Sequence, residues 1–112
     1  MANKSLMEGV PTVGLTTTAA QTTGVSGTLY GIVAKTNGRK RNLTIQMVYS
    51  GAPGASEYNL MGSIDGTNFE QIGSDLTGTD TLVEFETNVT FLRLDQVSRA
   101  NAVTATGYLF LA

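Results

Sequence analysis

The sequence predicts an all-β fold, namely a small antiparallel β-sandwich, jelly-roll-like, with an extended N-terminal arm. Short runs that alternate apolar and polar residues recur from residue 28 onward, and turn-forming residues separate them about every 8–12 positions. This spacing is typical of a sandwich or a barrel, and no segment has the length of a stable helix. We therefore expect an arm over residues 1–20 and a β-sandwich domain over residues 21–112.

The first segment of the chain differs from the rest because its apolar residues are isolated from one another. They are Leu6, Met7, Val10, Val13 and Leu15. Gly9, Pro11 and Gly14 would break a helix here, and the segment lacks the basic start and apolar run of a secretory signal. A frayed terminus is the plain interpretation. The number of apolar residues favours an extended arm that becomes ordered along a partner subunit.

Residues 28–34 and 43–49 read as strands, with an Asn37-Gly38 turn signal between them. The second run alternates most clearly, and its expected inward residues are Leu43, Ile45, Met47 and Tyr49. Residues 50–56 are rich in Gly, Ala, Ser and Pro, which predicts a loop.

A hairpin signal follows in residues 62–69, which read GSIDGTNF. Asp65-Gly66 predicts a two-residue type I′ turn, since such a turn needs positive φ at both central residues. On this interpretation Tyr58, Leu60 and Ile64 share one face of the first strand. Phe69 and Ile72 supply the apolar contacts of the returning strand.

The rest of the chain predicts a loop over residues 73–79 and strands over residues 82–85, 89–94 and 102–111. Residues 95–101 are the only helix candidate, and they are too short to form more than a turn. The last strand is apolar on both faces near its end: Val103, Ala105, Leu109 and Leu111 point one way, and Thr104, Thr106, Tyr108 and Phe110 the other. Such a strand is either central or covered by another chain, and we expect the chain to form oligomers.

Composition excludes most familiar chemistry. The chain has no His, Cys or Trp, which removes the usual general base, the main zinc ligands and the thiolates of iron–sulfur clusters. We therefore expect no enzyme, no cofactor and no metal site. The net charge of −2, with charged residues at 14%, predicts no binding to nucleic acid or anionic membrane. No segment has the ~20 apolar residues of a membrane span.

Two acidic groupings have plainer explanations than chemistry. Glu84 and Glu86 would share a strand face, whereas the carboxylates of a glycosidase usually come from separate elements. Asp65, Asp75 and Asp80 match no calcium loop, and the turn already explains Asp65.

The basic run Arg39-Lys40-Arg41 is the only charge cluster. It is a solvated turn, a protein contact or, least favoured, a nucleic-acid contact. Sugar binding needs exposed aromatic rings, and Tyr49, Phe69, Phe85 and Phe91 occupy positions suited to a core. A carbohydrate-binding module is therefore the second hypothesis.

Residues 58–69, YNLMGSIDGTNF, resemble the hairpin of small β-sandwich virion proteins of tailed bacteriophages. Residues 91–94 and 103–109 are similar to the way these proteins end, with a strand containing a central Arg, a loop and a Thr-rich strand. The turn is also similar to one in discoidin-like carbohydrate- or lipid-binding domains, where the aromatic is often Trp and the sandwich is larger. The resemblance covers roughly the C-terminal half of the chain.

The resemblance implies a capsid decoration, or cement, protein that clamps the capsid lattice non-covalently, or else a neck, tail or fibre component. It implies self-association, with a homotrimer expected, contacts to the major capsid protein or other virion proteins, and a place on the capsid surface after assembly in the host cytoplasm. Multivalent contacts across a lattice would multiply weak affinities. The expected contact residues are Leu6, Met7, Val10, Val13, Leu15, Arg39, Lys40 and Arg41.

Overall fold

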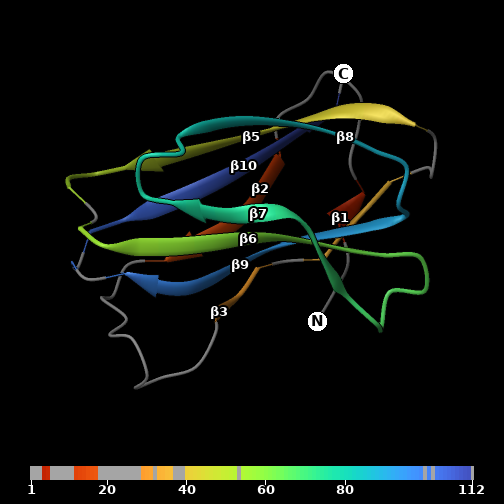
Figure 1. Cartoon of the computed structure of the whole chain (residues 1–112), viewed down its shortest axis with the longest axis horizontal. Helices are drawn as coiled ribbons and strands as arrows, with labels where there is room; N and C mark the ends of the chain where they lie inside the picture. Colours follow the sequence, from red (N-terminus) through yellow and green to blue (C-terminus); the bar gives the residue numbers. More distant parts are fainter. Residues whose placement is uncertain are drawn as a thin grey trace.

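The structure is a computed structural model that describes residues 4–5, 12–17, 29–31, 33–36, 40–52, 54–99, 101 and 103–111. These residues form strands in two sheets and no helix (Figure 1), which confirms the predicted all-β class. All strand pairs are antiparallel except β1 with β4. Because none of the described elements is helical, none is a candidate for a membrane-spanning helix.

The six-stranded sheet has the order β1-β4-β9-β6-β7, and β3 also pairs with β9. Its strands are β1 (Lys4–Ser5), β3 (Leu29–Tyr30), β4 (Ala34–Lys35), β6 (Ser56–Ser63), β7 (Glu70–Thr77) and β9 (Phe91–Arg99). The four-stranded sheet has the order β2-β10-β5-β8. Its strands are β2 (Thr12–Thr17), β5 (Arg41–Tyr49), β8 (Leu82–Thr87) and β10 (Ala105–Leu111).

One hydrophobic core contains residues from both sheets. Leu43, Ile45 and Leu109 come from the four-stranded sheet, and Tyr58 and Leu60 come from the six-stranded sheet; each is at most 1% exposed. The strict alternation of β5 confirms the strand predicted over residues 43–49, because its odd-numbered positions reach this core while Gln46 and Val48 remain exposed.

The predicted hairpin is present as β6 and β7, but the predicted type I′ turn is wrong. Among the described residues no non-glycine has positive φ, so Asp65 lacks the conformation that this turn requires, while Gly66 has φ 79°. The strands are joined by a longer loop, residues 64–69, with Gly62 opposite Glu70. Ile64 lies in this loop and is 80% exposed, so it does not share the buried face of Tyr58 and Leu60.

Three further expectations are wrong in their local structure. Residues 73–79, expected as a loop, mostly belong to β7, which reaches Thr77 by way of a bulge at Gly73. Residues 95–99, expected as a turn, extend β9, where Asp95 and Gln96 are buried. The strand expected over residues 28–34 is divided into β3 and the start of β4. The Asn37-Gly38 turn lies outside the described residues.

Two parts of the expected arm belong to sheets of this same chain. Thr12–Thr17 forms β2 along the edge of β10, with Leu15 opposite Gly107, and Lys4–Ser5 forms β1 beside β4. The remainder of residues 1–20 lies outside the described residues.

Candidate functional site

The β10 strand has buried side chains on one face and partly exposed side chains on the other. Ala105, Leu109 and Leu111 are buried toward the core, whereas Tyr108 and Phe110 remain partly exposed on the opposite face. This confirms the alternation expected from the sequence. Because β10 lies between β2 and β5, it is central in its sheet, and its outward aromatics stand in the middle of an open face rather than at an edge.

The strand register turns these aromatics into one side of a groove. Tyr108 is opposite Gln46, and Gln46 is opposite Leu82; Phe110 is opposite Thr44, and Thr44 is opposite Glu84. Side chains of paired residues project from the same face of a sheet. Larger side chains on β10 and β8 therefore flank the smaller polar side chains of β5 that lie between them.

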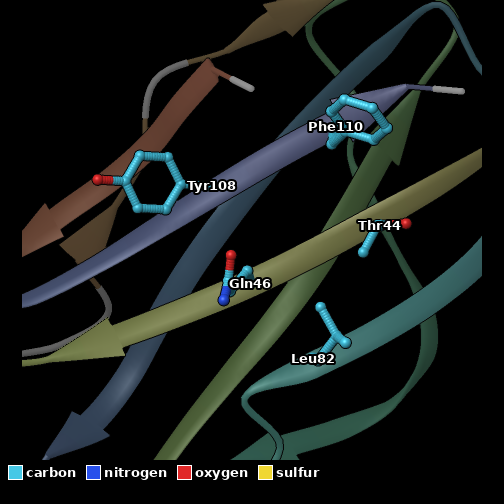
Figure 2. A pocket seen from close by; sticks show the side chains of 5 residues that line it. All are labelled: Thr44, Gln46, Leu82, Tyr108 and Phe110. Carbon is cyan, nitrogen blue, oxygen red and sulfur yellow. The ribbon is translucent and has the colours of Figure 1, made fainter. Parts of the chain in front are cut away.

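We call this feature the outer groove and define it by its lining residues, Thr44, Gln46, Leu82, Tyr108 and Phe110. Its volume is about 370 Å³. Figure 2 shows both rings rising from β10, Thr44 and Gln46 on β5, and Leu82 across from them on β8. Leu82 is 64% exposed, so the wall on the β8 side is open to solvent.

The floor of the outer groove is polar, and none of the five described residues that line the groove carries a positive charge. Within the described part of the chain, neither the Gln46 amide nor the Thr44 hydroxyl forms a hydrogen bond. Glu84 stands next to Thr44 on the same face and is exposed. One residue pair further along the sheet, Lys40 Nζ lies 3.0 Å from Glu86 Oε1, and both side chains are largely exposed.

The opposite side of the molecule contains a buried ion pair. On β9, Arg93 Nε and Nη2 donate to Asp95 Oδ1 and Oδ2 at 2.7 and 2.9 Å, and the guanidinium lies 4.2 Å from the centre of the Phe69 ring. Burial raises the pKa of the Asp95 carboxyl, and the Arg93 guanidinium opposes part of that rise. Each oxygen of the Asp95 carboxylate accepts one hydrogen bond from Arg93. Such a two-bond ion pair is typical of a pair that stabilises the fold.

Asp65 organises the loop between β6 and β7. Its Oδ1 accepts hydrogen bonds from the backbone amides of Asn68 and Thr67 at 2.8 Å each, and Ser63 Oγ lies 2.8 Å from the same atom. These bonds to the charged form, first those from the two backbone amides, hold the pKa of Asp65 well below its usual range. Asp65 is thus a loop-stabilising residue, and no metal-binding group of acidic residues occurs among the residues the structure describes.

The structure places only part of the expected contact set. Leu6, Met7, Val10 and Arg39 lie outside the described residues. Val13 lies in β2 opposite Tyr108 and is partly exposed, and Leu15 is in the same strand. Lys40 and Arg41 stand at the start of β5.

The register places the described contact segments in different halves of the four-stranded sheet. At one end β5 begins with Arg41 opposite Thr87, and β10 ends with Leu111 opposite Leu43. We call this region the basic end and define it by Lys40, Arg41, Thr87 and Leu111. Strand β2 begins with Thr12 opposite Leu109, which pairs with Ile45, and ends with Thr17 opposite Ala105, so β2 lies along the half of β10 that is farther from the basic end.

Sequence reasoning missed the outer groove because it lies across three strands that are not consecutive in the chain. It also placed Phe69 and Phe91 in the core, whereas Phe69 stacks on Arg93, and Phe91 is partly exposed and lies close to Gly66 of the loop. Phe85 and Tyr49 do pack against the core as expected. Glu84 and Glu86 are both exposed, as expected for residues two apart on a strand.

Comparison of the chain with protein-family models, with curated proteins and with solved structures finds no match. The geometry of the faces described above is therefore the basis for any statement about function.

Proposed function

We propose that this chain is a structural protein of a tailed-bacteriophage particle, of the capsid decoration type, which stabilises the lattice by non-covalent contact. We propose further that its two sheets form a jelly-roll sandwich. The hairpin resemblance in residues 58–69 supports the virion assignment, and the strand pairing supports the fold.

The strand pairs are nested, as they are when one long antiparallel hairpin folds over to form two sheets. Setting aside the short strands β1 and β3, the first and last strands pair (β2 with β10), then the next pair inward (β4 with β9), then β5 with β8 and β6 with β7. Jelly rolls of eight strands occur in viral capsid domains and in lectins. The fold alone does not select between such functions, and the surface of the molecule distinguishes them.

The observation that carries the proposal is the basic end, where Lys40 and Arg41 stand beside the last residues of β8 and β10. A single contact of this size is weak, whereas many copies that repeat it across a lattice bind strongly together. Lys40 and Arg41 place two positive charges at this end, and Lys40 pairs with Glu86 across exposed surface. We expect them to meet an acidic region of the capsid subunit, with electrostatic attraction guiding the encounter.

The test uses particles of the phage that encodes this chain, prepared from a mutant in which its gene is deleted. Purified protein added to these particles should sediment with them at a fixed, saturable number of copies, and gold-labelled antibody should mark the capsid. Labelling of the neck, tail or fibre instead would overturn the decoration role. Absence of the chain from wild-type virions by mass spectrometry would overturn the virion assignment altogether.

The contact surface is tested by the double variant Lys40→Gln/Arg41→Gln, which removes two positive charges at the basic end. Its matched control, Ala55→Glu/Thr104→Glu, changes net charge by the same amount at exposed positions near the opposite end of the strands. We expect particle binding to weaken about tenfold or more for the first variant only, and increasingly so at low salt. Equal weakening by both variants would show a general charge effect. Deleting residues 2–20 is a less specific test because it also removes β2.

A further inference from the structure

We propose that the outer groove is a binding site for a neutral carbohydrate, with sugar rings lying against Tyr108 and Phe110 and sugar hydroxyls bonded to Gln46 and Thr44. The inference is independent of the proposed virion role, because it concerns the outward face of the four-stranded sheet and not the basic end. Four observations carry it: the paired rings, the free polar floor, the charge around the groove and its size.

The two rings form a short platform. Tyr108 and Phe110 are two positions apart on β10, so both project outward and their Cα atoms are separated by about 7 Å along the strand. The faces of aromatic rings carry partial negative charge, which attracts the weakly positive C–H groups on the flat side of a pyranose. Two rings in line therefore provide places for adjacent sugar units of one chain (Figure 2).

The floor provides hydrogen-bonding groups that are not bonded to any described residue. The Gln46 amide both donates and accepts, and so does the Thr44 hydroxyl. A sugar hydroxyl has the same double character, so each floor residue can satisfy it in either direction. Because neither side chain is bonded to a described residue, binding a sugar breaks no hydrogen bond within the described part of the chain.

The charge around the groove selects a neutral ligand over an anionic one. None of its described lining residues is Lys or Arg, and Glu84 stands beside Thr44, so a phosphate, sulfate or nucleic-acid backbone would meet repulsion. The same reasoning disfavours a second copy of this chain. Two such faces would bring together Glu84 and Glu86 of both copies, and among the described residues of this face Lys40 is the cation that offsets them.

The volume suits a small saccharide segment. At about 370 Å³ the groove falls toward the lower part of the range of about 300–1,000 Å³ in which small-molecule sites lie. Its rigidity also favours binding, since β5 is paired on both sides and β10 is central in the sheet. Little backbone entropy is therefore lost when a ligand binds to these strands.

The test begins with the full chain on an array of neutral and charged glycans, followed by calorimetric measurement of the dissociation constant for the best neutral oligosaccharide. Tyr108→Thr keeps a strand-forming residue but removes the ring, and Gln46→Leu keeps similar volume but removes the amide. We expect Tyr108→Thr to weaken binding about tenfold and Gln46→Leu several-fold. Ile64→Thr, which alters an exposed apolar residue in the distant β6–β7 loop, is the matched control and should bind as the native chain does.

Thermal unfolding of each variant separates lost binding from lost structure, because all three positions are at least partly exposed and their variants should remain folded. Failure of every neutral glycan to bind the native protein, or preference for sulfated or phosphorylated glycans, would overturn the proposal. So would equal affinity in Tyr108→Thr. Self-association by light scattering that Tyr108→Thr abolishes, without glycan binding, would assign the face to a second copy instead. Particle binding through Lys40 and Arg41 is measured separately, so either proposal can fail alone.

Discussion

Replacing Arg93 by methionine should reveal how strongly the chain depends on its buried ion pair. The Arg93 and Asp95 side chains are 17% and 5% exposed and are joined by two short hydrogen bonds. Methionine fills similar space and leaves the Asp95 carboxylate buried without its partner. Removing one member of a buried pair costs about 3–5 kcal/mol, and loss of the guanidinium from the Phe69 ring adds about 0.5–1 kcal/mol.

The loss of stability in Arg93→Met should depend on pH, and the ionisation of Asp95 determines the direction of this dependence. Burial already raises the pKa of this carboxyl above 3.8, and removing the opposing Arg93 raises it further. The folded variant then binds a proton more readily than the unfolded chain, so its stability falls as pH rises between 3.8 and the raised pKa. The deficit relative to the native chain is therefore largest near neutral pH and shrinks as the solution is acidified.

Urea unfolding followed by far-UV circular dichroism measures these changes, since the chain has no Trp to serve as a fluorescent probe. The double variant Arg93→Met/Asp95→Leu removes both charges and should recover most of the loss. A loss below about 1 kcal/mol for Arg93→Met at neutral pH, or a loss independent of pH, would refute the claim that Asp95 is buried and charged.

Substitution of two buried residues and one loop residue gives three further predictions. Leu60→Ala, at a fully buried core position, should lower the free energy of unfolding in urea by about 2–5 kcal/mol; a change under about 1 kcal/mol would contradict the core assignment. Tyr58→Phe should leave stability equal or higher, because the buried Tyr58 hydroxyl has no hydrogen-bond partner among the described residues, and a clear loss would indicate a partner. Asp65→Asn should reduce acid sensitivity: the native chain loses the contribution of Asp65 as pH falls below 3.8, and thermal melts of both proteins at descending pH should converge.

The sequence predicted the elements whose pattern is local. Apolar and polar residues alternate in β5 and β10, and this alternation identifies the buried residues of both strands. Every second residue of a strand lies on the same face, so the apolar positions mark the buried face. The β6–β7 hairpin was also predictable, but its turn type was not. Asp65 and Ser63 make side-chain hydrogen bonds that stabilise a longer loop, and these compete with the two-residue turn that an Asp-Gly pair favours.

Features that depend on pairing between strands far apart in the sequence could not be predicted. Residues 95–99 look polar, yet they continue β9 because Arg93 neutralises Asp95 and both neighbouring segments pair with the strand. The outer groove needs the registers of β10 with β5 and of β5 with β8, and no local pattern in the sequence fixes either one. The outward direction of its residues on single strands was predictable, as for Tyr108 and Phe110 on the last strand, but their position side by side was not.

The bulge in β7 bears on how the edge of the six-stranded sheet can meet another chain. With only 14% charged residues the chain has few charges to place on exposed strand edges, and β7 forms one edge of the six-stranded sheet. At the bulge, Gly73 adopts φ 76°, and a Cβ there would lie 2.5 Å from the Phe85 ring, so the position accepts neither the conformation nor the bulk of another residue. The interrupted edge offers no regular ladder of amides and carbonyls to a neighbouring chain. The geometry at Gly73 therefore works against edge-to-edge strand pairing, a task for which charged side chains on an edge strand are another solution.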